Sequence, residues 1–292
     1  MARGQIREAH PRARSATKQP DWLSSCRRIV AAQRELFEAQ SGIATRTVYA
    51  GMGEGGDRTL AIDHHCEEIV FSELEAIHRQ GTAFNAISEE RGNVSFGGAG
   101  ADLFVVVDPL DGSLNARRMI PSHSLSIAVA TGLGMTDVET GYVYDFGSSE
   151  EYFAQRDQGA TLNGRELRAE GPGFGLEVVG IESAKPERTI PVLAALEGKA
   201  YRMRVLGSIA IALCYVAGGR FDGMLTSRRC RSVDAAAGQL IAREAGAAVV
   251  FDRSGLDVSL ALDARYHVAA ALDRGLLATV LAAQEHAEEA GT

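Results

Sequence analysis

The chain has 292 residues, of which 46% are hydrophobic and 23% are charged, and this composition is typical of a globular protein with a large core. Its formal net charge of -8 argues against non-specific binding to nucleic acid or to anionic membranes. The longest apolar stretch, which begins at Ile209, is too short to cross a bilayer. We therefore expect neither a nucleic acid nor a membrane as a partner.

In the N-terminal half, hydrophobic periodicity predicts helices and strands in alternation. Helices are predicted over residues 22–40 and 61–79, with a Gly-rich loop at 51–57 between them, and strands over 83–88, 103–107, 125–131, 141–146 and 151–155. Asn163-Gly164 is typical of a tight β-hairpin turn. Residues 1–20 are basic and polar without the apolar segment of a secretory signal, and they are predicted to be a flexible tail.

The C-terminal half continues the alternation. Strands are predicted over residues 176–183, 201–206, 221–226, 247–251 and 267–272, and helices over 186–196, 208–217, 234–244 and 274–288. Helices, a long run of strands and then α/β alternation favour layered sheets between helices, an α/β (α+β) fold. Cys26, Cys66, Cys214 and Cys230 form no C-x-x-C pair, so we interpret them as reduced thiols and expect a cytoplasmic protein.

Two aspartates close the apolar run at residues 103–107. Asp108 and Asp111 are separated by Pro109, which favours an extended backbone at Asp108. Carboxylates this close repel one another unless a cation lies among them. Oxygen-only ligands of this kind suit Mg²⁺, and the following Gly112-Ser113 offers backbone N–H groups and a hydroxyl that could hold a phosphate. The sequence therefore predicts a magnesium and phosphate site here.

Other acidic residues stand at the ends of predicted elements. Glu89 follows a predicted strand and Asp234 opens a predicted helix. Each has an ordinary explanation when taken alone, since Glu89-Glu90 could be a solvated turn and aspartate is a common helix cap. Their position at element ends also permits a role in the same metal site.

The chain resembles the inositol monophosphatase family in five segments that occur in the family's order. DPLDGSLN resembles the first signature, D-P-[IL]-D-G-[TS]-x-N, and SVDAAAGQLIAREAG resembles the second. ISEERG resembles the G-E-E segment, TLAIDHHCEEIV the T-x-x-D helix, and LGSIAIALCYVA the G-[ST]-A-A segment. Together they cover residues 58–251. The resemblance implies an α-β-α-β-α sandwich of the sugar phosphatase type over residues 21–292, with a metal-site half at about 21–170 and an α/β half at about 171–292.

The resemblance also implies a Mg²⁺-dependent phosphomonoesterase with two or three ions. Glu89, Asp108 and the carbonyl group of Leu110 would hold the first ion, and Asp108, Asp111 and Asp234 the second. A third, weaker ion would lie near Glu89, which thereby also takes part in catalysis. In this two-metal hydrolysis one ion activates the attacking water and the other stabilises the leaving oxygen.

Further residues are assigned by the same resemblance. Asp63 and Ser113 would match the pair that orients and deprotonates the attacking water. Gly112, Ser113, Gly207 and Ser208, together with Asp111, would line the substrate and its phosphate. The expected partner is a small phosphomonoester, inositol monophosphate first, and the expected assembly is a homodimer.

The sequence departs from the family pattern at several positions. Ser113 stands where threonine is commoner, Val233 where the family has tryptophan, and Ala247 where it has glycine. Ser227 occupies the position of a glutamate that contacts inositol in the animal enzymes, which puts selectivity for inositol in doubt. The run at residues 228–231 resembles the archaeal-type branch, which often accepts fructose 1,6-bisphosphate, and Arg231 could bind a second phosphate or belong to a solvated basic turn.

The sequence also contains features of other functional classes. The G-x-G-x-x-G motif at residues 51–56 would suit a dinucleotide-dependent oxidoreductase, but the segment before it is a poor strand. His64-His65 point to different faces of a helix and are interpreted as surface residues. Cys230 lacks a readable His or Asn partner and is interpreted as a plain thiol. A noncatalytic sugar-phosphate sensor remains an alternative, although it would not need a water-activating pair.

Overall fold

The computed structural model describes residues 20–47, 49–52, 58–98, 101–252 and 255–290. The helices in this part of the chain are α1 (Trp22–Ala39), α2 (Ile43–Arg46), α3 (Ala61–Arg79), α4 (Ser113–Arg118), α5 (Pro186–Leu196), α6 (Ile209–Ala217), α7 (Ser232–Glu244) and α8 (Arg274–Ala290), with a 3-10 turn at Met135–Asp137. The strands are β1 (Tyr49–Met52), β2 (Arg58–Leu60), β3 (Phe84–Ser88), β4 (Gly92–Phe96), β5 (Phe104–Asp111), β6 (Ser124–Ala130), β7 (Val138–Asp145), β8 (Glu150–Gln155), β9 (Ala160–Leu162), β10 (Arg165–Leu167), β11 (Leu176–Glu182), β12 (Ala200–Arg204), β13 (Gly223–Thr226), β14 (Ala248–Phe251) and β15 (Val268–Ala271).

Two large sheets organise the chain. The first has eight strands in the order β10-β9-β8-β7-β6-β5-β3-β4, and neighbouring strands are antiparallel except for the parallel pair β3 and β5. The second has five strands in the order β12-β11-β13-β15-β14, of which β12, β11 and β13 are parallel. The first sheet ends along the chain at Leu167 and the second begins at Leu176.

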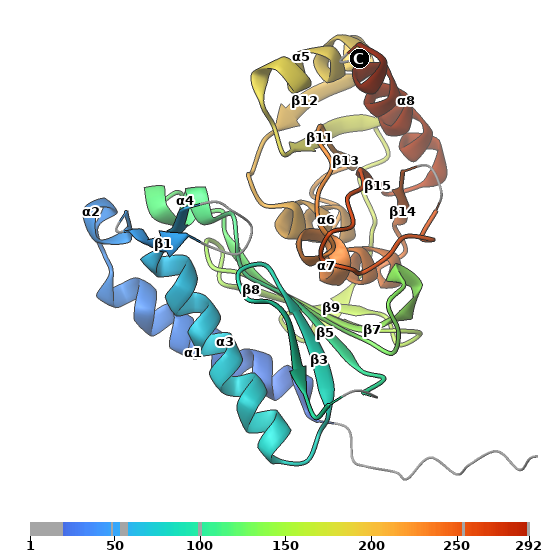
Figure 1. Ribbon diagram of the computed structural model, residues 1–292. Helices are drawn as coiled ribbons and strands as arrows, with labels where there is room; N and C mark the ends of the chain where they lie inside the picture. The colour runs from blue at the N-terminus through green and yellow to red at the C-terminus, as the bar shows by residue number, and fades with distance from the viewer. Residues whose placement is uncertain (1–19, 48, 53–57, 99–100, 253–254, 291–292) are drawn as a thin grey trace, which may run out of the picture.

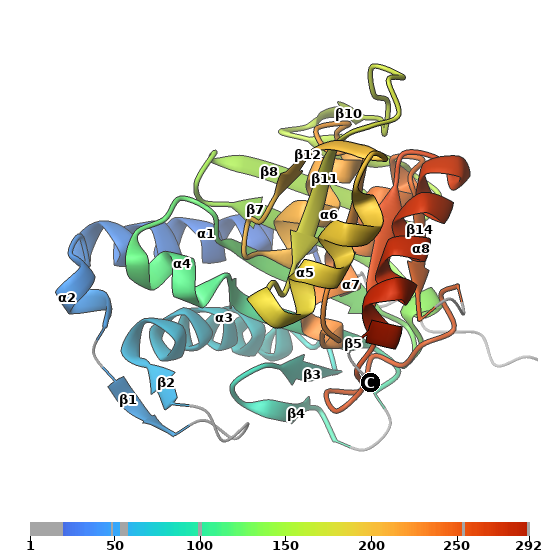
Figure 2. The ribbon, with the colours of Figure 1, turned by 90° about the horizontal axis from the view of Figure 1, so that it is seen from above.

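Helices cover both sheets and separate them (Figures 1 and 2). Helices α1 and α3 pack on one face of the first sheet, α6 and α7 lie between the two sheets, and α5 and α8 cover the outer face of the second. Both α6 and α7 are buried along most of their length, and α6 is apolar around nearly its whole circumference. The predicted α-β-α-β-α layered sandwich is confirmed.

Strand β5 shows how the layers are encoded. Val105 and Val107 belong to the core beneath α1 and α3, whereas Val106 belongs to the core around α6 and α7. Successive side chains of a strand point to opposite faces, so a continuous apolar run is required where both faces are covered. The last side chains of this strand therefore lie close to α7.

The predicted helices and strands are present, with bounds that differ by up to a few residues. The structure adds the strands β2 and β4 and the short helices α2 and α4, which the sequence did not predict, and β5 continues through Pro109 to Asp111 instead of ending at residue 107. Strand β1 begins at Tyr49, in the segment that is a poor strand by sequence, and ends at Met52 within the predicted Gly-rich loop. The tail at residues 1–19 and the loop core at 53–57 lie outside the described residues.

Candidate metal centre

A β-bulge places the two motif aspartates on the same side of the first sheet. Asp108 pairs with Ser126 of β6 and Asp111 pairs with Ser124, so three steps along β5 match two steps along β6. In a regular strand, residues three apart would point to opposite faces, and the extra residue of the bulge restores them to one face. A bulge also tolerates Pro109, which has no N–H group for the ladder.

Two further carboxylates reach the same place from other elements. Glu89 follows β3, whose carboxyl end lies beside that of the parallel strand β5. Asp234 lies in the first turn of α7, which packs across β5, β6 and β7. One carboxylate oxygen from each of Glu89, Asp108 and Asp234 lies within 4.8 Å of the other two. The predicted ligands from three separate segments therefore meet.

The electrostatics of this cluster fit a bound divalent cation. Burial, followed by repulsion from the neighbouring carboxylates, raises the pKa of Asp108 well above its usual value. Burial raises the pKa of Glu89 to about 7 and that of Asp111 to about 7, with repulsion from Asp234 adding to both. Hard oxygen donors whose ionised forms are disfavoured without a cation are suited to Mg²⁺. The residues present thus fit the predicted metal.

Asp111 has a second task, because it joins the two halves of the chain. Its Oδ2 accepts hydrogen bonds from the Ser208 hydroxyl at 2.6 Å and from the backbone N–H of Ala210 at 2.8 Å. Ser208 also caps α6, since its Oγ accepts the N–H of Ile211 at 3.2 Å. Asp111 therefore contacts the G-S segment that we predicted to line the substrate.

The loops around Gly112 and Gly207 lie in close contact. Both glycines have positive φ, and a Cβ on Gly112 would lie 2.9 Å from the Ser122 carbonyl oxygen and 3.1 Å from that of Gly207. The amide of Asn115 donates to the carbonyl oxygens of Ser122 at 2.7 Å and Leu206 at 2.6 Å. The first signature and the G-S segment thus lie against each other, with close backbone approach at Gly112 and a positive φ at both glycines, a conformation that favours glycine.

The predicted water-activating pair lies on neighbouring elements. Asp63 is in the first turn of α3 and buried, and Ser113 is the first residue of α4. Ile62 and Ala116, the neighbours of these two turns in sequence, belong to one small core cluster, so both turns border the same core. The Ser113 hydroxyl donates to the Leu110 carbonyl oxygen at 3.0 Å, so a predicted water-orienting residue contacts a predicted metal-binding carbonyl group.

Two buried glutamates that the sequence did not point out support the site. Glu67 accepts hydrogen bonds from the Ser88 hydroxyl at 2.6 Å and from the Arg91 backbone N–H at 2.9 Å, and so fixes the turn that carries Glu89. Glu182, at the end of β11, accepts the N–H groups of Leu206 and Gly207 at 3.0 and 2.8 Å. Burial raises the pKa of Glu182 to about 8, although these two hydrogen bonds act to lower it. No local sequence signal links either glutamate to its partner loop.

The Arg231 side chain points into the acidic cluster and not into solvent. Its Nη2 lies 2.5 Å from Glu89 Oε1 and 3.6 Å from Asp234 Oδ1. It is only partly exposed and pairs with two predicted metal ligands. The interpretation as a solvated turn is therefore wrong for this residue, although Arg229, which forms an ion pair with Asp252 at 2.9 Å, does lie at the surface.

The alternative sites find no support in the described residues. Cys230 is buried and its burial raises the pKa of the thiol well above the usual value, as expected for a plain thiol. All four cysteines are free. His64 is exposed and lies 3.4 Å from Glu68 on the same helix. The described residues of the G-x-G-x-x-G segment, Gly51 and Met52, belong to β1, which pairs antiparallel with β2 and is not part of a βαβ unit; residues 53–57 lie outside the described part.

Comparison with known proteins decides the family. The model of the inositol monophosphatase family matches residues 24–289. This chain belongs to the inositol monophosphatase family. It is 35% identical over 237 residues to a fructose-1,6-bisphosphatase/inositol-1-monophosphatase of Thermococcus kodakarensis, covering 80% of this chain and 86% of the relative. It is 30% identical over 240 residues to a fructose-1,6-bisphosphatase of Pyrococcus furiosus, covering 79% and 85%.

Solved structures of the family agree with the fold. An inositol monophosphatase–fructose 1,6-bisphosphatase crystal structure superposes with a TM-score of 0.76 at 25% identity, covering 90% of this chain and 100% of that one. The predicted class, a phosphoric monoester hydrolase of the inositol monophosphatase family, is confirmed. Within the described residues, no helix has both the length and the apolar character of a membrane span.

Proposed function

We propose that this protein hydrolyses the phosphate monoester of inositol monophosphate or of a related sugar phosphate, and that Mg²⁺ is its metal. The observation that carries the proposal is the meeting of Glu89, Asp108 and Asp234 within 4.8 Å, with Asp111 beside them on the same face of the bulged strand. A sugar-phosphate sensor would not need the water-activating pair that we predict at Asp63 and Ser113.

The protein groups that would hold Mg²⁺ are Glu89, Asp108, Asp111, Asp234 and the carbonyl group of Leu110. Bound Mg²⁺ supplies positive charge that lowers the pKa of water and stabilises negative charge on phosphate and leaving-group oxygens. Leu110 is held for this role, because its own N–H donates to Asp108 Oδ1 at 3.0 Å. Two or three ions would match the number of acidic ligands.

The substrate would lie against the loops that Asn115 joins. Gly112, Ser113, Gly207 and Ser208 would line its phosphate, and the bond from Ser208 to Asp111 keeps this lining in register with the metal ligands. Ser113 would orient the attacking water and pass its proton toward Asp63. Such fixed positioning supplies much of the rate enhancement in phosphoryl transfer.

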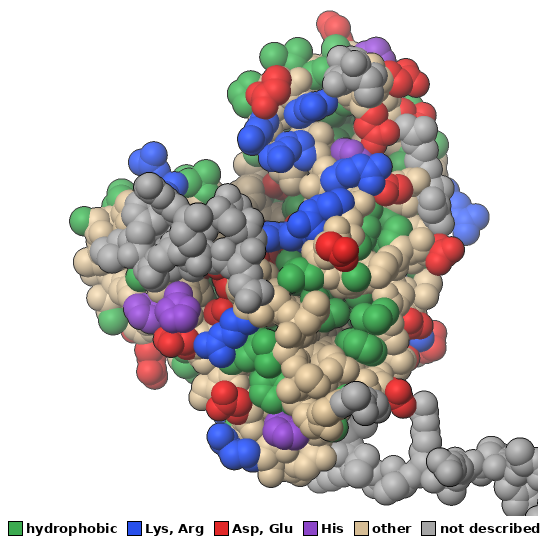
Figure 3. All heavy atoms as spheres, viewed as in Figure 1, with side chains coloured by type: hydrophobic (Ala, Val, Ile, Leu, Met, Phe, Trp, Pro, Cys, Tyr) green, Lys and Arg blue, Asp and Glu red, His purple; other side chains and the backbone are tan. Residues whose placement is uncertain are grey.

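Fructose 1,6-bisphosphate is a second candidate substrate, favoured by the surroundings of Ser227. The Ser227 hydroxyl bonds to the carbonyl oxygens of Glu182 and Ser183, so this position offers no carboxylate to sugar hydroxyls. Ser227 lines a cavity of about 420 Å³ whose other lining residues include Arg188, Arg228, Arg229 and Arg265. Figure 3 shows Lys and Arg side chains gathered on this face of the C-terminal half. Several arginines close together suit a second phosphate.

A substrate panel tests the proposal. Phosphate release from inositol 1-phosphate, fructose 1,6-bisphosphate, fructose 6-phosphate and a nucleoside monophosphate is measured with Mg²⁺ and with EDTA. We expect Mg²⁺-dependent release from the first two. If the wild type prefers the bisphosphate, and Arg228→Gln loses this preference but keeps its activity on inositol 1-phosphate, the arginine-lined cavity binds the second phosphate of fructose 1,6-bisphosphate. Binding of these esters without any hydrolysis would favour the sensor.

We also infer a homodimer. The edge strand β12 and the residue after it expose the apolar side chains of Tyr201, Met203 and Val205, and exposed apolar groups on an edge strand favour association. Light scattering of the purified protein tests this: we expect twice the chain mass of 31.1 kDa, and a monomer at micromolar concentration would contradict it.

A further inference from the structure

Arg231 is the cation that the structure places inside the acidic cluster. Its guanidinium contacts Glu89 Oε1 at 2.5 Å and lies 3.6 Å from Asp234 Oδ1. Its backbone N–H donates to Asp234 Oδ2 at 2.8 Å, so the main chain at the start of α7 is fixed by the same carboxylate. The side chain therefore bridges the end of β3 and the start of α7 across 142 positions of sequence.

Neighbouring arginines are engaged elsewhere. Arg91 pairs with Glu67 at 3.5 Å, Arg229 pairs with Asp252, and Arg265 donates to the carbonyl oxygens of Leu262 and Ala264. Attraction to Arg231 lowers the pKa of Glu89 and of Asp234 and opposes the effect of burial on both. Among the described residues, Arg231 is the side chain whose positive charge directly contacts this cluster.

A metal ion and the guanidinium require the same carboxylates. Glu89 and Asp234 supply two of the three ligand atoms that converge within 4.8 Å, and the same two carboxylates bind Arg231. A divalent ion held there would also repel a guanidinium a few ångströms away. We propose that Arg231 is a built-in counter-cation which stabilises the metal-free protein, and which a divalent ion must displace in order to bind to Glu89 and Asp234.

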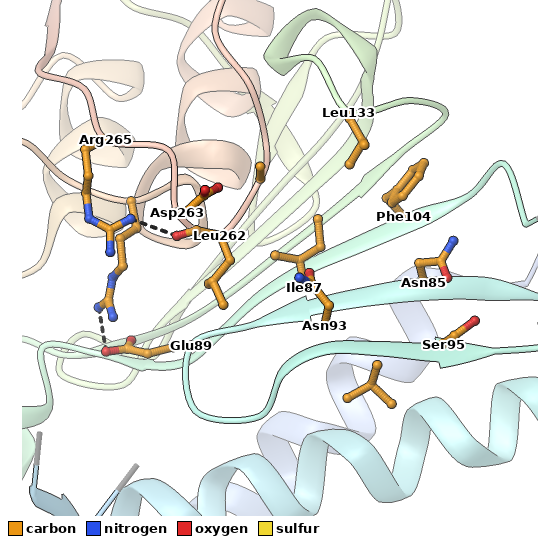
Figure 4. A pocket seen from close by; sticks show the side chains of 13 residues that line it. Asn85, Ile87, Glu89, Asn93, Ser95, Phe104, Leu133, Leu262, Asp263 and Arg265 are labelled. Atoms are coloured by element: carbon orange, nitrogen blue, oxygen red, sulfur yellow. Dashed lines mark hydrogen bonds and ion pairs between the residues drawn. The ribbon is translucent and has the colours of Figure 1, made fainter. Parts of the chain in front are cut away.

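The structure has room for the displaced side chain. Arg231 and Glu89 line one end of a cavity of about 690 Å³, whose lining includes Asp263 and Arg265 (Figure 4). Asp263 lines the same cavity, and its carboxylate would be an acceptor for the displaced guanidinium. Displacement therefore requires a change of side-chain conformation and no movement of the sheets. Because the ion pair must be broken first, Arg231 lowers metal affinity and sets the concentration at which the site fills.

This inference rests on the proposed metal site, and its test reports on binding, not on turnover. Protein freed of metal with EDTA and then desalted is titrated with Mg²⁺ by calorimetry, for the wild type, Arg231→Met and Arg229→Met. Methionine keeps an unbranched side chain and removes the charge. We expect Arg231→Met to bind Mg²⁺ about tenfold more tightly, the equivalent of one modest ion pair. Arg229→Met, on the same loop but paired with Asp252, should bind like the wild type.

Thermal unfolding gives a second readout. In EDTA, Arg231→Met should unfold at a lower temperature than the wild type, because Glu89 and Asp234 lose their counter-cation, and Mg²⁺ should raise its unfolding temperature by more. Arg231→Lys keeps the charge and should retain an affinity close to that of the wild type. If Arg231→Met unfolds without metal, its Mg²⁺-loaded form is instead titrated with EDTA, and more EDTA should be needed than for the wild type.

The possible failures are distinguishable. Equal or weaker Mg²⁺ binding by Arg231→Met, while the wild type binds Mg²⁺, would overturn the counter-cation and leave the proposed function intact. If Arg231→Met binds Mg²⁺ no more tightly than the wild type and only its KM for the substrate is raised, Arg231 binds the substrate instead. If the wild type itself binds no divalent ion, the proposed metal site fails and the counter-cation fails with it.

Discussion

Ser208 donates its hydroxyl to Oδ2 of Asp111 at 2.6 Å, and this hydrogen bond ties the start of α6 to the end of β5. Ser208 and Asp111 are both buried. The bond therefore fixes a predicted metal ligand and a predicted substrate loop relative to each other, although the two residues lie 97 positions apart in sequence.

Removal of this hydroxyl should destabilise the fold measurably. Ser208→Ala leaves a buried carboxylate oxygen with one donor fewer and α6 without its cap, so we expect the free energy of unfolding to fall by about 1–3 kcal/mol. Urea denaturation in EDTA measures it. Ser126→Ala is the control, because that buried hydroxyl makes only a long bond of 3.5 Å to Val233. Equal, small losses in both variants would contradict a special role for Ser208.

The metal-free protein should lose stability as the pH rises above about 6.5. The pKa values of Glu89 and Asp111 are raised to about 7, and that of Glu182 to about 8. A carboxyl group whose pKa is higher in the folded chain contributes stability that is present at low pH and lost as the pH passes the folded value. His123, whose pKa is lowered by burial, acts in the opposite sense, but only below its usual value of 6.5.

The measurement is the unfolding temperature in EDTA between pH 6.5 and pH 8.5. A decrease over this window is expected, and saturating Mg²⁺ should reduce or reverse it, since the ion binds the ionised carboxylates. A metal-free protein that becomes more stable over the same window would contradict the account of the cluster.

Asp108→Asn should separate stability from activity. The variant removes one buried negative charge from a group of like charges, so its unfolding temperature in EDTA should rise above that of the wild type. Phosphatase activity at millimolar Mg²⁺ should fall at least about 100-fold, because a shared metal ligand is lost. Asp145→Asn is the control: that buried aspartate accepts bonds from Gly147 and Tyr215 and should give no gain in stability.

Ser113 and Asp63 should act as one unit. Ser113→Ala removes the hydroxyl but keeps the backbone N–H groups, so kcat should fall by roughly 10²–10⁴ with little change in KM. Asp63→Asn should cost a similar factor, and the double variant little more than either single one. Ser113→Thr should remain active. Steady-state phosphate release at saturating Mg²⁺ measures all four, and fully additive losses would reject the pair.

Local sequence was sufficient for the elements whose pattern is unambiguous. The helix predicted over residues 61–79 is present with those bounds, because its apolar positions repeat at helical spacing. Local sequence was insufficient where the pairing of strands decides the structure. The strand β4 is half exposed and lacks a clear apolar alternation, and it forms by pairing with β3. The extension of β5 through Pro109 depends on a bulge opposite β6, which the sequence of β5 alone does not encode.

For the site, the signatures identified the ligands but not their supports. Glu89, Asp108 and Asp234 could be named because each stands in a recognisable segment at the end of an element. Glu182 and its partner Gly207 lie 25 positions apart, and no spacing rule connects a strand-end glutamate to that loop. The contact of Arg231 with Glu89 was equally hidden, since it depends on how β3 and α7 pack, and this is set by the tertiary structure.

The most direct test of the central claim is a Mg²⁺ titration of phosphate release from inositol 1-phosphate by the wild type, Asp108→Asn and Asp234→Asn at one pH. The account predicts saturable, EDTA-reversible activity for the wild type, and for both variants activity that is lost at concentrations saturating for the wild type. Mg²⁺-independent release by the wild type, or wild-type turnover by either variant at low Mg²⁺, would contradict the assignment of this cluster as the catalytic metal centre.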